Sequence, residues 1–268
     1  MTAVTPALLD AVIHLAITAG EKILAVYSTD FRVQQKNDHS PVTEADRQAD
    51  ETIVAGLKML TPGIPALSEE ADAPAYSVRA AWKKLWLVDP LDGTREFVKR
   101  NGEFTVNIAL IEAGDPVLGV VYAPVSSTCY YAMRGHGAFK KTGSQAPVAI
   151  HTKRYQPDTQ MIVTGSRSHN TGDELRRLLT QIGPHKYLPM GSALKSCLVA
   201  EGAADIYPRF GPTCEWDTAA AQCVVEEAGG KFTDMALQPL RYNMRDTLLN
   251  PHFLVFGDAS YDWLRLLK

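Results

Sequence analysis

The sequence predicts a mixed α/β protein, with an α+β first half packed closely against an α/β second half. Hydrophobic residues make up 46% of the 268 residues, which suffices for a large core. Short apolar runs of strand length dominate residues 85–150, whereas from residue 161 such runs alternate with helix-length segments. Because no linker or repeat separates the halves, we expect two lobes of one domain, roughly 1–150 and 151–268.

Two amphipathic helices are expected at the start of the chain. Apolar residues recur at helical spacing over residues 9–27. A polar stretch then predicts an extended segment and a loop, and a second helix should begin near Thr43. Thr43 and Asp46 resemble a capping box, although Asp is shorter than the usual Glu or Gln. The run Thr61-Pro62-Gly63 should end this helix.

The remaining elements are read from short apolar or periodic runs. In the first half we expect strands at 85–88, 106–111, 117–122, 129–133 and 138–141, of which the second and third should form a hairpin. In the second half we expect strands at 161–164, 186–189, 205–207 and 252–256, helices at 174–182, 193–201 and 218–228, a hairpin around 231–242, and a C-terminal helix.

Composition argues against several classes of protein. A net charge of −3 gives no reason to expect a nucleic-acid partner. No run of about 20 apolar residues predicts a transmembrane helix. The N-terminus lacks a basic region and its apolar stretch contains Asp10 and His14, so we expect no signal peptide and a cytoplasmic protein. Without a CxxC spacing, the four cysteines should be reduced thiols. The sequence does not decide whether the protein binds peripherally to the inner membrane, or whether it is a monomer or a homodimer.

The most informative segment is residues 85–94, LWLVDPLDGT. An apolar strand runs straight into Asp89 and Asp92, and a buried carboxylate is costly unless it is paired or binds a metal. Pro90 fixes a torsion between the two acids, and Gly93 permits a tight turn. The amides of Gly93 and Thr94 could form a phosphate-binding nest. Taken alone, Asp-Pro and Asp-Gly are equally consistent with an ordinary turn.

Three further acidic loci strengthen the interpretation as a metal site. Glu69 and Glu70 follow a turn, Asp217 lies at the start of a helix, and Asp46 lies at another. Individually, a solvated charge or a helix cap explains each of them better. Hard divalent cations require several carboxylate oxygens from different segments. Four separate loci meet that requirement if the fold brings them together, which periodicity does not determine.

These segments together resemble a known phosphatase superfamily. The run DPLDGT at residues 89–94, the upstream Glu69-Glu70 and the downstream Trp216-Asp217 have the order and spacing of the lithium-sensitive, magnesium-dependent phosphatases, and the similarity covers essentially the whole chain. That superfamily includes inositol monophosphatases, fructose bisphosphatases and 3′(2′),5′-bisphosphate nucleotidases. The resemblance implies a layered αβαβα sandwich of the sugar-phosphatase type.

Other segments are similar to the bacterial CysQ-type bisphosphate nucleotidases within that superfamily. They are TREF at 94–97, KRNGEFTVN at 99–107, SRSH at 166–169, GSALK at 191–195 and YPRFGPT at 207–213. Inositol monophosphatases typically carry TTNF in place of TREF. The resemblance implies hydrolysis of the 3′-phosphate of 3′-phosphoadenosine 5′-phosphate, and of its sulfated relative, in sulfur assimilation and nucleotide recycling.

The resemblance also implies two or three Mg²⁺ ions with specific ligands. The first would be held by Glu69, Asp89 and the carbonyl of Leu91, the second by Asp89, Asp92 and Asp217, and a weaker third by Glu69 and waters. Glu70 would lie outside the ligand set.

Catalytic and substrate-binding roles follow from the same resemblance. Asp46 and the Thr94 hydroxyl, beside Glu69, would orient and activate the attacking water. The amides of Gly93 and Thr94 would bind the phosphate, with the metal-site residues Glu69, Leu91, Asp92 and Asp217 around it. Arg167, Lys195 and Arg209 are candidates for the second phosphate because cationic side chains pair with phosphate, although each taken alone is better explained as a surface charge.

Two alternatives stay open at this stage. The first is an inositol monophosphatase or fructose-1,6-bisphosphatase with the same metal site. The second is a non-catalytic metal- or nucleotide-binding module built on a decayed phosphatase. Such a module should lack at least one of the six residues proposed for chemistry, and all are present: Asp46, Glu69, Asp89, Asp92, Thr94 and Asp217.

Overall fold

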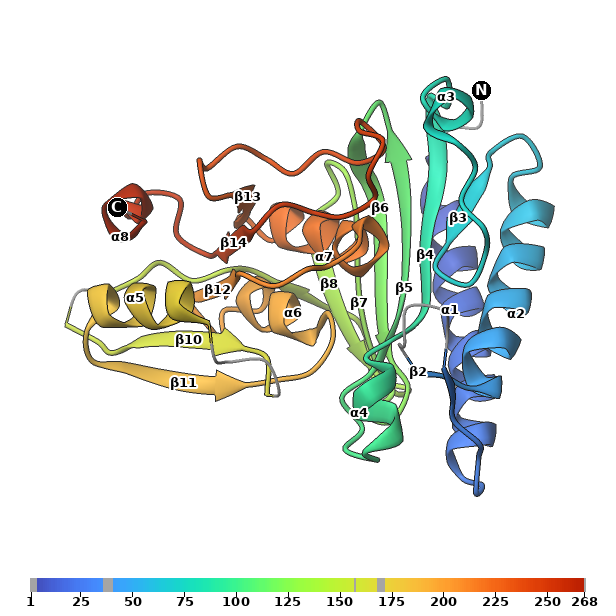
Figure 1. Cartoon of the computed structure of the whole chain (residues 1–268), viewed down its shortest axis with the longest axis horizontal. Coiled ribbons are helices and arrows are strands. Elements are labelled where there is room, and N and C mark those ends of the chain that lie inside the picture. The colour runs from blue at the N-terminus through green and yellow to red at the C-terminus, as the bar shows by residue number, and fades with distance from the viewer. Residues whose placement is uncertain (1–3, 36–40, 157, 168–171, 268) are drawn as a thin grey trace.

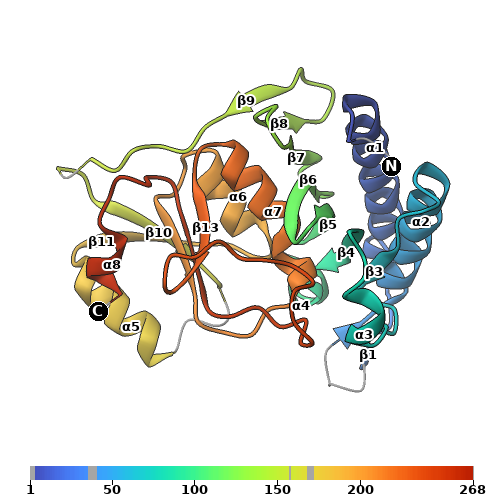
Figure 2. The same cartoon turned by 90° about the horizontal axis from the view of Figure 1, so that it is seen from above.

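The computed structural model describes residues 4–35, 41–156, 158–167 and 172–267. It has five layers, seen edge-on in Figures 1 and 2: a helix pair, a large sheet, a second helix pair, a smaller sheet and an outer helix layer. The predicted αβαβα sandwich is therefore confirmed. None of the helices in the described ranges is both long enough and apolar enough to span a bilayer.

The helices of the described residues are α1 (Pro6–Tyr27), α2 (Glu44–Leu60), α3 (Tyr76–Arg79), α4 (Thr94–Val98), α5 (Asp173–Ile182), α6 (Leu194–Ala200), α7 (Glu215–Glu227) and α8 (Trp263–Leu266). The strands are β1 (Gln34–Gln35), β2 (Pro41–Val42), β3 (Ala66–Ser68), β4 (Lys84–Asp92), β5 (Thr105–Glu112), β6 (Asp115–Ala123), β7 (Thr128–Met133), β8 (Ala138–Thr142), β9 (Val148–Ile150), β10 (Met161–Gly165), β11 (His185–Pro189), β12 (Ile206–Arg209), β13 (Lys231–Asp234) and β14 (Phe253–Phe256).

Helices α1 and α2 cover the outer face of the large sheet (Figure 2). Their apolar faces are buried with the facing side chains of the sheet in one hydrophobic cluster. The capping box predicted for α2 is present, since the backbone N–H and the hydroxyl of Thr43 both donate to Asp46 Oδ2 at 2.7 Å. The cap holds Asp46 in one place at the start of the helix.

The large sheet has seven strands in the order β3-β4-β5-β6-β7-β8-β9. The predicted hairpin is formed by β5 and β6. Strand β4 is longer than predicted, because Asp89 still pairs with Asn107 and Asp92 with Thr105 across a shift in register. Pro90 lies inside that shift, where its missing N–H interrupts the ladder. Both aspartates therefore lie within the irregular end of the strand.

The smaller sheet has five strands in the order β11-β10-β12-β14-β13. The hairpin predicted around residues 231–242 forms in a short version: Asp234 N–H donates to Gln238 O at 2.8 Å, Leu240 N–H donates to Phe232 O at 3.4 Å, and an antiparallel bridge joins Thr233 to Pro239. The regular ladder of β13 is made with β14. Proline cannot donate to a ladder, which explains why no second strand develops around Pro239.

Helices α6 and α7 fill the space between the two sheets (Figure 1). The approach of α7 to the large sheet is close: a Cβ added at Gly119 of β6 would lie 2.3 Å from the carbonyl oxygen of Ala220. Three successive alanines of α7, at positions 219–221, are buried in the same cluster. Small side chains on both sides thus place the N-terminus of α7 against the end of β4.

Candidate metal and phosphate site

Three carboxylates from different elements converge at the end of β4. Glu69 follows β3, Asp89 belongs to β4, and Asp217 lies in the first turn of α7. One ligand oxygen from each lies within 4.8 Å of the others. Parallel pairing of β3 with β4 places Glu69, whose N–H donates to Val88 O at 3.1 Å. The fold thus brings together three of the acidic loci that the sequence left separate.

The electrostatics of this cluster favour a bound cation. Burial raises the pKa of Asp89 well above its usual range, and the charges of Glu69, Asp92 and Asp217 raise it further. Burial and the charge of Asp92 raise the pKa of Asp217 to about 8. A divalent ion would remove this mutual repulsion. The ligand atoms are all hard carboxylate oxygens, so the residues fit Mg²⁺ better than a softer metal.

Asp92 lies beside this group and is fixed from the second half of the chain. Its Oδ2 accepts the N–H of Ala193 at 2.6 Å and the side-chain amide of Asn107 at 3.3 Å. Burial raises its pKa, and the nearby Lys195 opposes that effect. Since both bonds use Oδ2, the carboxylate is held in one rotamer.

In the turn around Asp92, the Thr94 hydroxyl donates to the carbonyl oxygen of Leu91. Leu91 N–H donates to Asp89 Oδ1 at 3.1 Å, and Leu91 O lies 3.2 Å from the Thr94 hydroxyl. Gly93 has φ +90°, and a Cβ there would lie 3.2 Å from Glu103 O. Only glycine combines that backbone conformation with this close packing without strain.

The fourth acidic locus, Asp46, reaches the same turn. Its Oδ1 lies 3.4 Å from Thr94 Oγ1, while its Oδ2 accepts the two capping bonds from Thr43. The same carboxylate therefore caps α2 and faces the hydroxyl at the start of α4.

Two adjoining cavities open from the carboxylates. The smaller, about 240 Å³, is lined by Asp92, Gly93, Thr94 and Lys195 among others. The larger, about 800 Å³, extends over the aromatic residues Phe210 and Trp216, and both cavities share Glu69 and Asp217. Together they form a charged end beside a more apolar chamber.

Three cations among the described residues line these cavities: Arg95 and Arg209 line both, and Lys195 lines the smaller one. Lys195 is buried, its Nζ donates to Ser192 O at 2.5 Å, and burial lowers its pKa to about 8 against the opposing charge of Asp92. Arg209 donates from Nη2 to Pro212 O at 3.1 Å, and its buried Nε has no partner among the described residues. A phosphate in the cavity would supply an acceptor for that Nε.

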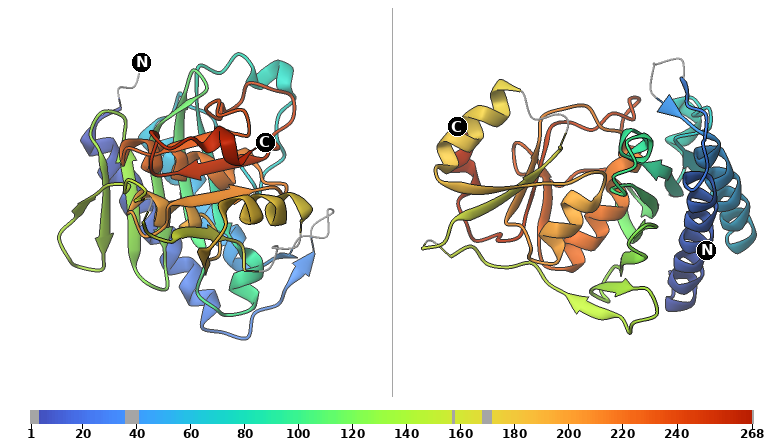
Figure 3. Two further views of the ribbon diagram at one scale, coloured as in Figure 1. Left: turned by 90° about the vertical axis from the view of Figure 1, so that its left-hand side faces the viewer. Right: turned by 90° about the horizontal axis from the view of Figure 1, so that it is seen from below.

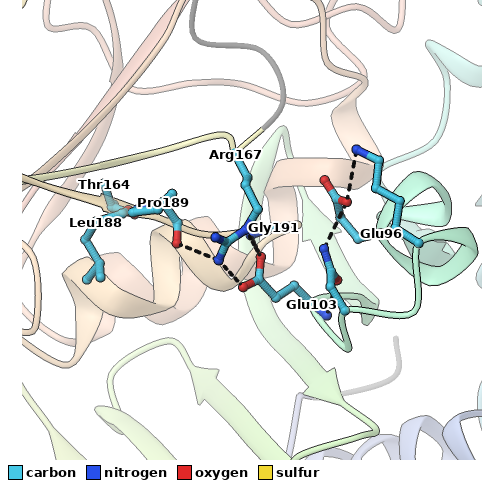
Figure 4. Close-up of polar contacts among 9 residues, drawn as sticks. Glu96, Glu103, Thr164, Arg167, Leu188, Pro189 and Gly191 are labelled. Atoms are coloured by element: carbon cyan, nitrogen blue, oxygen red, sulfur yellow. Dashed lines mark hydrogen bonds and ion pairs between the residues drawn. The ribbon is translucent and has the colours of Figure 1, made fainter.

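Arg167, the third predicted phosphate ligand, is differently placed (Figure 4). Its guanidinium forms a two-bond ion pair with Glu103, at 2.5 and 3.2 Å, and also donates to Pro189 O at 3.3 Å. The side chain of Glu103 also accepts the Gly191 N–H at 2.8 Å. Arg167 lines neither cavity. To bind a phosphate it would have to give up its bonds to Glu103.

Sequence reasoning missed two kinds of site residue. The Asn107 side-chain amide donates to Asp92, and a polar amide within an otherwise apolar strand could have indicated a role in the site. The Ala193 N–H bonds to the same carboxylate, and a backbone donor leaves no signal in a sequence.

Comparisons with known proteins agree with this geometry. The family model of the inositol monophosphatase family matches residues 6–258. The 3′(2′),5′-bisphosphate nucleotidase CysQ of Salmonella typhimurium is 50% identical over 250 residues, which is 92% of this chain and 99% of that protein. The CysQ of Haemophilus influenzae is 40% identical over 263 residues, 97% of each chain.

Among solved structures, CysQ from Bacteroides thetaiotaomicron superimposes with a TM-score of 0.81 at 41% identity, covering 95% of this chain and 98% of its own. The suhB protein of Bartonella henselae superimposes with a TM-score of 0.80 at 26% identity, covering 98% of each chain. The chain thus belongs to the inositol monophosphatase family.

Proposed function

We propose that this chain is a Mg²⁺-dependent phosphatase that removes the 3′-phosphate of 3′-phosphoadenosine 5′-phosphate, giving AMP and phosphate. The observation that carries the proposal is the carboxylate cluster opening into a cavity that is also lined by three cations, Arg95, Lys195 and Arg209. The bisphosphate nucleotidases at 40–50% identity support the choice of substrate. The sulfated nucleotide has the same 3′-phosphate and would be accepted too.

We propose the following metal ligands. Glu69, Asp89 and Leu91 O would hold one Mg²⁺, and Asp89, Asp92 and Asp217 a second, with Glu69 and waters as a weaker third site. When bound, these ions neutralise the phosphate oxygens, activate water and steady the leaving oxygen. The bonds that Asp92 and Asp217 accept from Ala193 and Cys214 hold the two carboxylates in place before any ion arrives.

The chain's own groups would handle the attacking water. The Thr94 hydroxyl would donate a hydrogen bond to Asp46 Oδ1, which lies 3.4 Å away, and would accept a hydrogen bond from the attacking water. Water then forms a bond to phosphorus as the bond to the 3′-oxygen breaks. The water's proton moves through the Thr94 hydroxyl toward Asp46, and solvent protonates the departing 3′-oxygen. The amides of Gly93 and Thr94 would orient the phosphate.

The second phosphate and the base would occupy the rest of the cavities. Lys195 and Arg209 line the smaller one, so they suit the 5′-phosphate. Phe210 and Trp216 line the larger one, whose volume of about 800 Å³ and aromatic walls suit adenine. Arg167, bound to Glu103, would stay outside the substrate.

Phosphate release with Mg²⁺ tests the proposal. We would compare 3′-phosphoadenosine 5′-phosphate, inositol 1-phosphate, fructose 1,6-bisphosphate and AMP. A large preference for the first substrate is expected. A preference for inositol 1-phosphate or fructose 1,6-bisphosphate would keep the metal site and assign the enzyme one of the other activities of the family. Release from none would indicate a non-catalytic binding module.

We also propose that residues 1–150 and 151–268 form two lobes of a single domain. The hydrophobic cluster between the two sheets supports this, since it joins Leu87 and Val121 of the first lobe to Val224 and Phe253 of the second.

A further inference from the structure

Two buried ionisable side chains, one basic and one acidic, lie on the chain segments that carry the carboxylate cluster. Arg79, the last residue of α3, is 2% exposed, and Glu215, the first residue of α7, is fully buried. Their hydrogen-bond partners in the described structure are neutral groups, and burial raises the pKa of the Glu215 carboxyl to about 7.

Asn243 joins these two side chains. Arg79 Nη1 donates to Asn243 Oδ1 at 2.7 Å, and Asn243 Nδ2 returns a bond of 2.7 Å to Arg79 O. The backbone N–H of Asn243 donates to Glu215 Oε2, also at 2.7 Å. Arg79 Nη2 further donates to the carbonyl of Asp246. Arg79, Asn243 and Glu215 thus form one continuous buried network.

The network spans the two segments that carry metal-site carboxylates. Arg79 ends the stretch of chain that begins at Glu69, and Glu215 precedes Asp217 by two residues. The C-terminal segment that supplies Asn243 lies beside α3 in the left view of Figure 3. It then runs along the start of α7, where Glu215 N–H donates to Leu248 O at 2.9 Å.

The network is not expected to stabilise the fold. Arg79 Nε and Glu215 Oε1 are buried and have no hydrogen-bond partner among the described residues. A buried polar atom left unsatisfied costs about 1–3 kcal/mol. Burying charges of opposite sign is often less stable than packing apolar groups of the same volume, although it can fix one arrangement of the chain.

We propose that Arg79, Asn243 and Glu215 are positioning residues that set the separation between Glu69 and Asp217 for the metal. The inference rests on the proposed function only in taking those two carboxylates as metal ligands. None of the three lines the cavities. Their effect would therefore appear in Mg²⁺ affinity.

The test is Mg²⁺ titration by calorimetry, without substrate, on Arg79→Met and Asn243→Gly, with melting temperatures measured in EDTA. Asn243 has φ +55°, so glycine keeps the backbone and its N–H to Glu215 while removing the side-chain link. Arg134→Met is the matched control, since Arg134 pairs with Asp115 at 3.6 Å on the surface and its side chain is 52% exposed.

We expect Mg²⁺ affinity to fall about tenfold or more in both variants, as for the loss of groups that orient metal ligands, and to stay unchanged in the control. The direction is diagnostic for Arg79→Met. Removing a positive charge near the site would tighten Mg²⁺ binding if charge alone mattered, whereas loss of position weakens it.

Wild-type affinity, or tighter binding, in folded variants of both kinds would overturn the positioning role and leave the metal assignment intact. If Arg79→Met does not fold, Asn243→Gly decides alone, because it removes no charge. Absence of Mg²⁺ binding by the wild-type protein would overturn the metal assignment and the positioning role with it.

Discussion

Replacing Asp89 by Asn should have opposite effects on activity and on the stability of the metal-free protein. Asn keeps the size of Asp89 and its Oδ1, which accepts the Leu91 N–H at 3.1 Å. It removes one negative charge from three carboxylates whose ligand oxygens lie within 4.8 Å. We therefore expect a folded variant that has lost Mg²⁺-dependent turnover but melts higher than the wild type in EDTA at alkaline pH.

The magnitude follows from the spacing. Two unit charges at 4.8 Å repel by about 3.5 kcal/mol at an effective dielectric constant of 20. That energy raises a neighbouring pKa by about 2.5. In the same direction, burial and then the charges of Glu69, Asp92 and Asp217 raise the pKa of Asp89 well above its usual range.

The pH dependence has a definite sign. Between pH 4 and 8 the folded, metal-free protein retains a proton on Asp217 that the unfolded chain has lost, and Asp89, whose pKa is raised well above its usual range, also keeps its proton to higher pH than in the unfolded chain. Stability therefore falls as pH rises through this window, by about 1.4 kcal/mol per pH unit for each retained proton. Asp89→Asn lacks one such group, so its loss of stability with pH should be shallower.

Thermal melts in EDTA from pH 5 to 9, repeated with Mg²⁺, would measure this. Mg²⁺ should raise the melting temperature of the wild type at pH 8 and leave that of the variant nearly unchanged. Turnover should fall by more than about 100-fold, since even the outer partners of metal ligands are worth 10- to 100-fold. Substantial activity in the folded variant, or identical pH slopes, would refute the assignment of Asp89.

Three further substitutions test the other site residues. Asp46→Asn should slow turnover more than about 100-fold with Mg²⁺ affinity nearly unchanged; a lower melting temperature alone would leave Asp46 as a helix cap only. Lys195→Met should raise KM for the bisphosphate substrate about tenfold or more with little change in kcat. Because the pKa of Lys195 is lowered to about 8, the wild-type KM should rise above that pH and the variant's should not. Arg167→Met should change KM less than Lys195→Met, because Arg167 is bound to Glu103; an equal rise would place Arg167 on the phosphate. Initial rates over substrate and pH measure all three.

The sequence predicted the elements whose signals are local. The capping box of α2 and the β5–β6 hairpin depend on residues a few positions apart, and both are present. The hairpin at residues 231–242 is present only as a bridge and two backbone hydrogen bonds, and the longer ladder of β13 with β14, some twenty residues later, was not predicted. The full length of β4 was missed because its last pairs, such as Asp92 with Thr105, interrupt the apolar pattern.

The site was predictable in its members but not in its geometry. Glu69, Asp89 and Asp217 were each recognisable as candidates, yet their convergence depends on β3 pairing parallel with β4 and on α7 packing against Gly119. Such contacts join distant segments and have no local pattern. The engagement of Arg167 by Glu103, 64 residues earlier, was hidden for the same reason.

The sequence suggested that an acidic residue is either a helix cap or a catalytic or metal-binding carboxylate. The structure shows that one residue can cap a helix and also face the site. A carboxylate has two oxygens, and Asp46 uses Oδ2 for the cap and turns Oδ1 toward Thr94. Asp217 likewise accepts the Cys214 N–H with Oδ2 at 2.8 Å and still contributes an oxygen to the cluster. Capping bonds hold each carboxylate in one rotamer. The side chain therefore loses its conformational entropy on folding, and ligand binding does not have to order it. An acidic N3 residue at a helix that starts beside a strand end is therefore a better candidate for a site because it is a cap.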